Sequence, residues 1–443
     1  MSSPRRERRP GLASIEEIAY LIHGAVQRSA ADETEIAWIE LQRGRVAARG
    51  QRMSEELATE RTILTRVIDR GRVGSYRTGA GEPGELDNAV RLAVAQSRVR
   101  QPVPGLAHLP AEAAAGNGQP EIHDRAIADL TIESAANLLR DVLEPRESAE
   151  LQWCEARVAL CNSRSVRRKA GVTAIQISVA AGSASATSAA RRLDELDAGE
   201  VGERARARAS GSERAALPER PLSLVLSPEA SISLVELLAE TSFSARAYHD
   251  GTSFLREHLG VQVFDRSLHL RDDATDPAGL PFPFDLEGTL KRPVDLIRDG
   301  IPRTPALDQR QAAILGLPST AHAIGGNNAR AEHLFLEPGE LREAEILEAA
   351  EGGLWVSSLS GLETIDPLRL RFRARAHGAR RIEQGRLGRP VPGFRWEDSL
   401  LRAFADLGGI GCASQRRLSP DGYLGGISAP AVWLRDVGDL TPL

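Results

Sequence analysis

The stretch from Gly251 to Gly288 constrains the fold more than any other part of the chain. Its apolar residues between Phe264 and Leu270 alternate with polar neighbours, which is typical of a half-buried strand. The pair Asp272-Asp273 then begins a turn rich in Asp, Pro and Gly. Because the prolines that follow favour an extended backbone, we expect a second strand from about Leu290 to Leu296.

The region around this stretch predicts a β-rich C-terminal domain at residues 220–443. It contains many short alternating runs separated by Gly and Pro, a pattern that favours antiparallel strands. One long helix is expected near its start, after a short strand from Ser223 to Leu226. Ser227 can cap this helix and Pro228 suits its first position, so the helix should run to about Thr241.

The N-terminal part predicts helices and hairpins. A capping box at Ser14 indicates a helix that runs to about Ser29. A first hairpin is expected between Glu35 and Arg49, with its turn at Arg43-Gly44. A second hairpin is expected between Thr62 and Thr78, with its turn at residues 69–71, and a helix then follows from about Leu86.

Residues 101–122 are rich in Pro and Gly and predict a linker. Beyond them, the pattern indicates a helix from Leu130 to Leu143 and alternating strands at Cys154–Leu160 and Ile175–Val179. The run Arg191–Ala209 predicts a charged, exposed helix.

The predicted fold class is therefore α+β, with N-terminal α/β units followed by a mainly antiparallel β domain that has one long helix at its start. The expected division is a flexible tail (1–13), an N-terminal α/β unit (14–100), a linker (101–122), a middle α/β unit (123–215) and the C-terminal domain (220–443).

Composition indicates a soluble globular protein, with 42% hydrophobic and 26% charged residues among 443. No apolar run is long enough to cross a bilayer and the N-terminus lacks an apolar core, so we expect a cytoplasmic protein with no membrane partner. A net charge of −5 argues against nucleic acid as a partner. Three cysteines, Cys154, Cys161 and Cys412, are too few for a disulfide framework and predict reduced thiols.

Several short motifs occur together in one order along the chain. They are Arg72-Val73-Gly74-Ser75, Asn162-Ser163, Gly251-Thr252-Ser253-Phe254-Leu255, Leu259-Gly260, Val263-Phe264-Asp265, Asp272-Asp273, Gly279-Leu280-Pro281, Phe284-Asp285, Glu287-Gly288 and His333-Leu334-Phe335-Leu336-Glu337-Pro338-Gly339. In combination they resemble the signature of the TldD/PmbA family, historically labelled modulators of DNA gyrase and understood as cytosolic peptidases. The resemblance covers most of residues 14 to 360.

In the TldD half of that family, the helix after Ser227 carries a zinc motif of histidine, glutamate, three further residues and histidine. Alignment without gaps places Glu236 and Thr241 at the positions of the histidines, and Leu237 at the position of the glutamate. Leucine cannot act as a base and threonine is a poor zinc ligand. The resemblance therefore implies no catalytic residue and no metal in this chain.

The resemblance points instead to the PmbA or TldE type, which lacks the zinc motif and pairs with a TldD subunit. It implies a heterodimer in which zinc lies in the TldD-like partner and both subunits wall a chamber that admits flexible peptides. The divergence of the C-terminal third suggests a dedicated precursor peptide as the substrate. Candidate chamber residues are Thr252, Ser253, Asp265, Asp272 and Asp273. Asp272 and Asp273 could serve as an acid/base pair, although side chains bonded to backbone amides in a turn are more usual.

Two other functions stay open from the sequence. Glu236 and Glu240 are one helical turn apart with His249 nearby, so an independent hydrolase with a rebuilt metal site is conceivable, although such carboxylates are usually surface features. Cys412 stands close to where TldD-type chains supply a zinc ligand, but no neighbouring histidine would activate it. The other alternative is a regulatory binding protein without a proteolytic role.

The C-terminal third departs from the family pattern. Arginines at positions 369, 371, 373 and 375 would share one face of a regular strand, with Leu370 and Phe372 on the other face. The arginine face is either solvated or a surface that binds an acidic peptide or partner.

Overall fold

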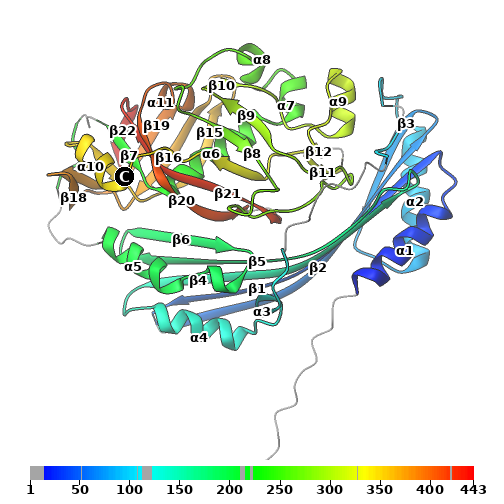
Figure 1. Ribbon diagram of the computed structural model, residues 1–443, viewed down its shortest axis with the longest axis horizontal. Coiled ribbons are helices and arrows are strands. Elements are labelled where there is room, and N and C mark those ends of the chain that lie inside the picture. Colours follow the sequence, from blue (N-terminus) through cyan, green and yellow to red (C-terminus); the bar gives the residue numbers. More distant parts are fainter. Residues whose placement is uncertain are drawn as a thin grey trace, which may run out of the picture.

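A long six-stranded sheet forms the N-terminal part of the protein (Figure 1). The computed structural model describes residues 14–50, 52–106, 108–111, 122–209, 215–219, 223–326, 328–419 and 422–443. The strand order is β3-β2-β1-β4-β5-β6, and all neighbours are antiparallel. The elements of this part are α1 (Ile15–Gln27), β1 (Glu33–Arg49), β2 (Arg52–Asp69), β3 (Arg72–Thr78), α2 (Pro83–Arg98), α3 (Arg125–Ala128), α4 (Ile132–Val142), β4 (Ser148–Asn162), β5 (Arg167–Ala181), β6 (Ala184–Ala190) and α5 (Ala198–Ala209).

This sheet joins the two expected N-terminal units. β1, from the first unit, pairs with β4, from the second, along a register that runs from Glu35 opposite Asn162 to Arg49 opposite Ser148. The two units therefore share one sheet, and the boundaries drawn between the units stay predictions. The expected tail at residues 1–13, and parts of the expected linkers, lie outside the described residues.

The first predicted hairpin is wrong, because β1 continues through Arg43 and Gly44 without a turn. Gly44 sits beside the indole ring of Trp153 on β4, where a Cβ atom would collide with the ring. The glycine therefore provides space for a tryptophan rather than a turn. The second predicted hairpin is confirmed, with β2 and β3 joined at Arg70-Gly71.

Helices pack on the six-stranded sheet in two groups (Figure 1). α1 and α2 bury apolar residues against one end of the sheet, around Trp38 and Ile63, and Ser14 caps α1 as expected. α4 and α5 cover the other end, around Leu151 and Ile177.

The helix predicted for Arg191–Ala209 is too long, because α5 begins only at Ala198. Arg191 is buried instead of exposed, and its guanidinium donates hydrogen bonds to the carbonyls of Thr173, Leu280 and Leu424. Because these contacts fix Arg191 against segments distant in the sequence, α5 does not extend back to Arg191.

The C-terminal domain is mainly antiparallel, which confirms the predicted fold class. A ten-stranded sheet includes two parallel pairs, β13 with β21 and β14 with β7, and a four-stranded sheet has the order β15-β16-β19-β22. The elements are β7 (Leu224–Leu226), α6 (Pro228–Ser242), α7 (Ala245–His249), α8 (Leu255–His258), β8 (Leu270–Asp272), β9 (Val294–Arg298), β10 (Ile301–Pro302), α9 (Gln309–Leu315), β11 (Ala323–Gly325), β12 (Asn328–Ala329), β13 (His333–Leu336), α10 (Glu343–Ala349), β14 (Leu354–Val356), β15 (Ser358–Asp366), β16 (Arg371–His377), β17 (Arg380–Glu383), β18 (Arg386–Pro390), β19 (Phe394–Ser399), α11 (Leu400–Ala403), β20 (Leu407–Ser419), β21 (Gly422–Leu434) and β22 (Asp439–Pro442).

The long helix at the start of this domain is confirmed as α6. The hydroxyl of Ser227 accepts a hydrogen bond from the amide of Ala230, and Pro228 occupies the first turn. Most of α6 is buried, because the helix packs against β21 and β15.

The strand predicted between Phe264 and Leu270 is wrong for most of its length, since β8 begins only at Leu270. Phe264 is buried in a loop whose shape is fixed by Asp265, which accepts hydrogen bonds from the amides of Ser267 and Leu407. The second predicted strand is observed as β9, which starts a few residues later than expected, at Val294.

The C-terminal domain packs on the face of the six-stranded sheet opposite α3 and α4 (Figure 1). Phe282 and Phe284 contact a cluster of β4 and β5 residues that includes Val158 and Val172. Farther along, the amide of Leu418 on β20 donates a hydrogen bond to the side chain of Gln176 on β5. The stretch that carries the sequence signature therefore lies against the N-terminal sheet.

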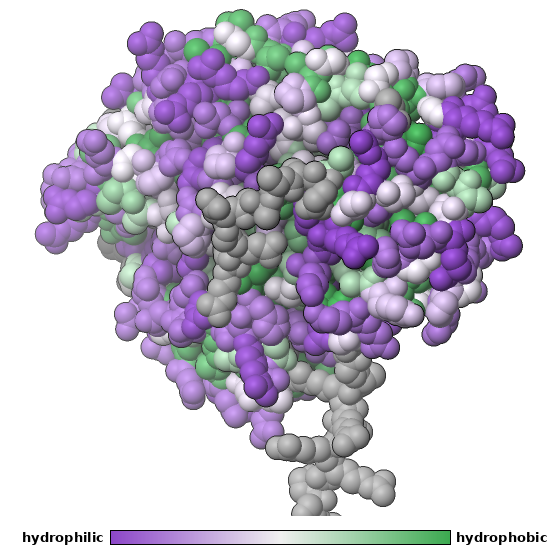
Figure 2. Space-filling view, turned by 45° about the vertical axis from the view of Figure 1, so that its right-hand side comes forward, coloured by the Kyte–Doolittle hydropathy of each residue, from purple (hydrophilic) through white to green (hydrophobic). Residues whose placement is uncertain are grey.

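The surface is largely hydrophilic on the face seen in Figure 2, where hydrophobic residues lie singly or in small groups. Within the described part of the chain, none of the helices combines the length and the apolar character needed to span a membrane.

Candidate functional site

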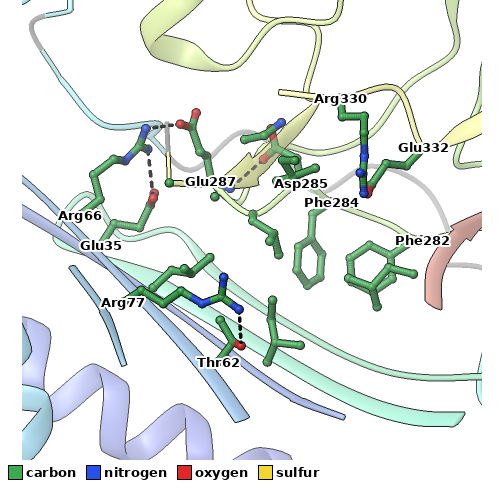
Figure 3. Close-up of a pocket in the computed structure, with 18 of the residues that line it drawn as sticks. Glu35, Thr62, Arg66, Arg77, Phe282, Phe284, Asp285, Glu287, Arg330 and Glu332 are labelled. Atoms are coloured by element: carbon green, nitrogen blue, oxygen red, sulfur yellow. Dashed lines mark hydrogen bonds and ion pairs between the residues drawn. The ribbon is translucent and has the colours of Figure 1, made fainter. Parts of the chain in front are cut away.

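A cavity of about 590 Å³ lies between the N-terminal sheet and the C-terminal domain (Figure 3). One wall is formed by residues of β1, β2 and β3, and the opposite wall by residues 282–291 and 323–333. The volume falls in the range of small-molecule and peptide sites. Since most of the opposite wall comes from the signature stretch and the segment after it, this cavity is the candidate functional site.

A buried ion cluster closes one end of the cavity. The Arg66 guanidinium on β2 forms ion pairs with Glu35 on β1 and with Glu287 on the loop before β9 (Figure 3). Glu287 also accepts a hydrogen bond of 3.0 Å from the amide of Gln309 at the start of α9. The cluster therefore connects the N-terminal sheet to two segments of the C-terminal domain.

Acidic groups outnumber basic groups in this cluster, because Asp285 and Asp308 also lie near Arg66. Burial, which is only partly offset by Arg66, raises the pKa of Glu35 to about 7 and the pKa of Glu287 to about 8. Burial also raises the pKa values of Asp285 and Asp308. The cluster consequently binds protons at neutral pH that isolated carboxylates would release.

Asp285 also fixes the loop that carries Glu287. One carboxylate oxygen accepts hydrogen bonds from the amides of Glu287 and Thr289, and the other from the amide of Ala323 on β11. Gly288 follows in a left-handed conformation, at φ +77°, and packs directly on Leu160 of β4. The loop thus needs both the carboxylate and the glycine in order to approach the sheet.

The middle of the cavity is apolar. The rings of Phe282 and Phe284 have centroids 5.0 Å apart, and Figure 3 shows both rings directed toward the strands. Ile39 and Leu41 on β1 and Leu64 on β2 line the facing wall. This part of the cavity suits an apolar side chain.

Two cationic side chains line the cavity without a carboxylate partner among the described residues. Arg77 on β3 donates a hydrogen bond of 3.1 Å to the hydroxyl of Thr62 (Figure 3), and Lys291 follows the Asp285 loop. Neither forms an ion pair with any residue in the described ranges. By contrast, Arg330 on the same wall is paired with Glu332.

None of the five candidate chamber residues is among the described residues that line this cavity. Thr252 is exposed, and the buried hydroxyl of Ser253 donates a hydrogen bond to the carbonyl of Ser242. Asp265 is a loop residue. Burial opposes its ionisation, but hydrogen bonds from Ser267 and the amide of Leu407, together with nearby Arg435, lower its pKa. A role of these residues in a substrate chamber stays a prediction.

Asp272 and Asp273 both accept hydrogen bonds from backbone amides, but only Asp273 does so within a turn, because Asp272 ends β8 and its amide partners are 60 and 61 positions away. Asp272 is buried and accepts hydrogen bonds from the amides of Glu332 and His333. Although burial opposes ionisation, neighbouring His322, 3.2 Å away, contributes to holding the pKa of Asp272 well below its usual range. Asp273 accepts a hydrogen bond from the amide of Thr275.

The three positions aligned with the zinc motif have other contacts. Glu236 on α6 forms an ion pair with Arg417 on β20, and Leu237 packs against the main core of the C-terminal domain. The hydroxyl of Thr241 is 3.0 Å from that of Thr364 on β15. These side chains do not fit a zinc site, because one is an ion-pair partner, one is apolar and one is a hydroxyl.

The alternative site residues are also dispersed. His249 is exposed at the end of α7, and Cys412 is exposed on β20. Across the residues that the structure describes, no group of three or more His, Cys, Asp or Glu side chains is arranged to hold a metal ion.

The arginine-rich segment has the predicted two faces only from Arg371 onward, because Arg369 and Leu370 lie in the turn before β16. Leu370 and Phe372 are buried, while Arg371 and Arg373 on β16 both pair with Glu397 on β19. Arg369 pairs with Asp366, so much of the positive charge on this face is balanced within the protein.

Sequence reasoning missed the Arg66 cluster and the cavity beside it. One signal was present, because Glu35 and Arg66 interrupt apolar runs in segments predicted as strands. A charged residue at such a position is buried only with a partner, and that partner lies in a segment distant in sequence.

The C-terminal domain is similar to a known protein family. Residues 219–438 match the family described as the PmbA/TldA metallopeptidase C-terminal domain. No curated protein is significantly similar in sequence.

Solved structures share the fold across the whole chain. A protein described as a modulator of a DNA gyrase from Thermotoga maritima is 17% identical with a TM-score of 0.81, over 97% of this chain and 100% of that one. TldE from Thermococcus kodakarensis is 19% identical with a TM-score of 0.78, over 96% and 99%. A protein described as a modulator of DNA gyrase from Bacteroides thetaiotaomicron is 17% identical with a TM-score of 0.76, over 97% of this chain and 99% of that one.

Proposed function

Since the chain belongs to the TldD/PmbA family, a group of metallopeptidase-like proteins, we propose that it is the non-catalytic subunit of a heteromeric peptidase. In this proposal a TldD-like partner holds the zinc ion and cuts the peptide. The present chain helps to enclose the chamber in which flexible peptides are cleaved, in the cytoplasm and without nucleic acid as a partner.

The contacts of α6 carry this proposal. The helix α6 is present, but Glu236 forms an ion pair with Arg417, and Leu237 packs against the hydrophobic core. A water-activating base would have to replace a partly buried leucine that packs against the core. The helix therefore supports a structural role better than a catalytic one.

The cavity between the two parts of the chain supports a peptide-handling role. It combines an apolar wall around Phe284 with charged groups at its edges, which is the usual composition of ligand sites. A peptide could enter it only as a flexible segment, because a volume of about 590 Å³ is far too small for a folded domain.

Co-expression with a TldD-type protein of the same genome tests the proposal. The chain alone should contain no stoichiometric zinc and should not cleave an unfolded peptide such as reduced, carboxymethylated casein. The purified pair should contain zinc and cleave it, and a variant of the partner without its zinc ligands should be inactive.

Two results would contradict the proposal. Stoichiometric metal and cleavage by the isolated chain would indicate an independent hydrolase. Failure of the chain to bind any TldD-type protein, together with full activity of that protein alone, would indicate a binding protein without a proteolytic role.

A further inference from the structure

Most charges that line the cavity are matched inside the protein. Glu35 and Glu287 pair with Arg66, and Glu60 pairs with Arg43. On the opposite wall, Arg330 pairs with Glu332, and the carboxylate of Asp285 is occupied by three backbone amides. These groups are held in the structure and do not require a ligand.

Arg77 and Lys291 are the exceptions. Arg77 is exposed and contacts the neutral hydroxyl of Thr62, so its charge is not neutralised by a carboxylate within the described ranges. Lys291 is half-buried, and its ammonium lies close enough to Asp272, Asp285 and His333 to influence their charges without pairing directly with any of them. Two cations on opposite walls of one cavity are thus left without a carboxylate partner among the described residues.

The use of lysine at position 291 is itself unusual in this chain. Its 56 basic residues other than histidine are all arginine except for two, Lys169 and Lys291. Lys169 pairs on the surface with Glu16, at 2.7 Å, whereas Lys291 lines the cavity. The two lysines therefore form a natural pair of test and control positions.

The neighbouring wall determines what kind of anion would fit. Phe282 and Phe284, facing Ile39 and Leu41, form an apolar surface beside the cations. A free inorganic anion would leave this surface in contact with water, whereas a carboxylate attached to an apolar group would cover it. The C-terminus of a peptide that ends in an apolar side chain has both features.

We propose that this cavity binds the C-terminal end of a short peptide, with Arg77 and Lys291 receiving the terminal carboxylate and Phe282 and Phe284 receiving the last apolar side chain. This inference rests on the proposed peptide-handling function and adds the end of the peptide that this subunit recognises. It requires no chemistry in the cavity, only binding.

Calorimetric titration of the full-length chain with three short peptides tests the proposal. The probes are Ala-Ala-Ala-Leu-Phe with a free C-terminus, the same peptide with a C-terminal amide, and Ala-Ala-Glu-Leu-Phe amide, which carries its carboxylate on a side chain. The free acid should bind, and both amides should bind at least about tenfold more weakly, because each lacks the charged terminal group.

Variants locate the binding. Lys291→Gln and Arg77→Gln should each weaken binding of the free acid about tenfold and reduce the difference between acid and amide. Lys291→Arg should retain binding, since it keeps the charge, and Lys169→Gln should leave binding unchanged. Arg77 is exposed, so Arg77→Gln tests the proposal even if Lys291→Gln affects folding.

Several outcomes would overturn the inference. These are equal binding of acid and amide, no binding of any probe, equal affinity for the glutamate-containing amide and the free acid, or equal affinity in Lys291→Gln, Arg77→Gln and Lys169→Gln. If the pair with a TldD-type partner cleaves peptides while these binding results are negative, the inference fails and the proposed function stands. If the chain binds the free acid selectively but the pair does not cleave peptides, the inference stands and the proposed function fails.

Discussion

Arg66 on β2 and Glu287 on the loop before β9 form a buried ion pair that joins the N-terminal sheet to the C-terminal domain. Their side chains are 9% and 5% exposed, and 221 positions separate them in the sequence. Because the pair also forms one end of the cavity, the same contact supports the association of the two parts and the shape of the candidate site.

Replacing Arg66 should be strongly destabilising. Arg66→Met removes the only described cation in contact with Glu35 and Glu287, and leaving a buried charge uncompensated typically costs about 3–5 kcal/mol. Urea denaturation followed by circular dichroism would measure the loss. The control is Arg28→Met, because Arg28 pairs with Asp87 on the surface and should change stability by about 1 kcal/mol or less. Equal losses in the two variants would contradict a buried role for the cluster.

The buried carboxyl groups of Glu35 and Glu287 should make the unfolding free energy fall as the pH rises from about 5 to about 8. Burial raises the pKa of Glu35 to about 7 and of Glu287 to about 8, from an ordinary value of 4.5. In this window each of the two groups binds more protons in the folded state than in the unfolded state, and each extra proton lowers the unfolding free energy by about 1.4 kcal/mol per pH unit. Burial lowers the pKa of His333 to about 3, so this group has the opposite effect below about pH 6.5.

Glu287→Gln provides the check on this pH dependence. Glutamine cannot titrate, so the variant should show a flatter decline in unfolding free energy over the same pH range than the parent protein. Denaturation curves at several pH values would compare the two proteins. An unchanged slope in the variant would show that Glu287 does not have a raised pKa.

Gly288→Ala should weaken the contact between the Asp285 loop and the N-terminal sheet. An alanine there would have to adopt φ near +77° and would place its methyl group 2.7 Å from Leu160 and Val166. Backbone strain and overpacking together should lower the unfolding free energy by about 2 kcal/mol or more. Gly84→Ala in α2 is the matched control, because no atom lies within 4 Å of the added methyl group. Thermal unfolding should separate the two variants.

Features that depend on neighbouring residues were predictable from the sequence, whereas those that depend on distant residues were not. Ser227 and Pro228 lie at the start of α6 and signal it directly, and the turn at Arg70-Gly71 is equally local. Gly44 looked like a turn residue because nothing nearby in the sequence reveals the Trp153 ring that it accommodates. Arg191 looked exposed for the same reason, since the carbonyls of Leu280 and Leu424 that it contacts lie in the C-terminal domain.

The same distinction applies to the candidate site. The importance of residues 251–288 was evident, but the five candidate chamber residues lie outside the cavity lining, while Phe282, Phe284, Asp285 and Glu287 reach the cavity. Arg66, the ion-pair partner of Glu287, comes from a strand 221 positions earlier in the sequence. No local pattern identifies such a pairing.

The contact between Glu236 and Arg417 leads to a last prediction about the helix that carries the zinc motif in TldD-type proteins. Arg417 donates hydrogen bonds to Glu236 and, at 3.1 Å, to the hydroxyl of Ser233, so α6 and β20 are held together at this position. Glu236→Ala and Arg417→Ala should each lower the unfolding free energy by about 1–3 kcal/mol, as expected for a partly buried charged hydrogen bond. The double variant should lose less than the sum of the two, because the second substitution removes a group whose partner is already absent. Elemental analysis should find the zinc content of the complex with a TldD-type partner unchanged in Glu236→Ala. Additive losses of unfolding free energy together with a lower zinc content would instead indicate that Glu236 is a metal ligand. That result would favour an independent hydrolase.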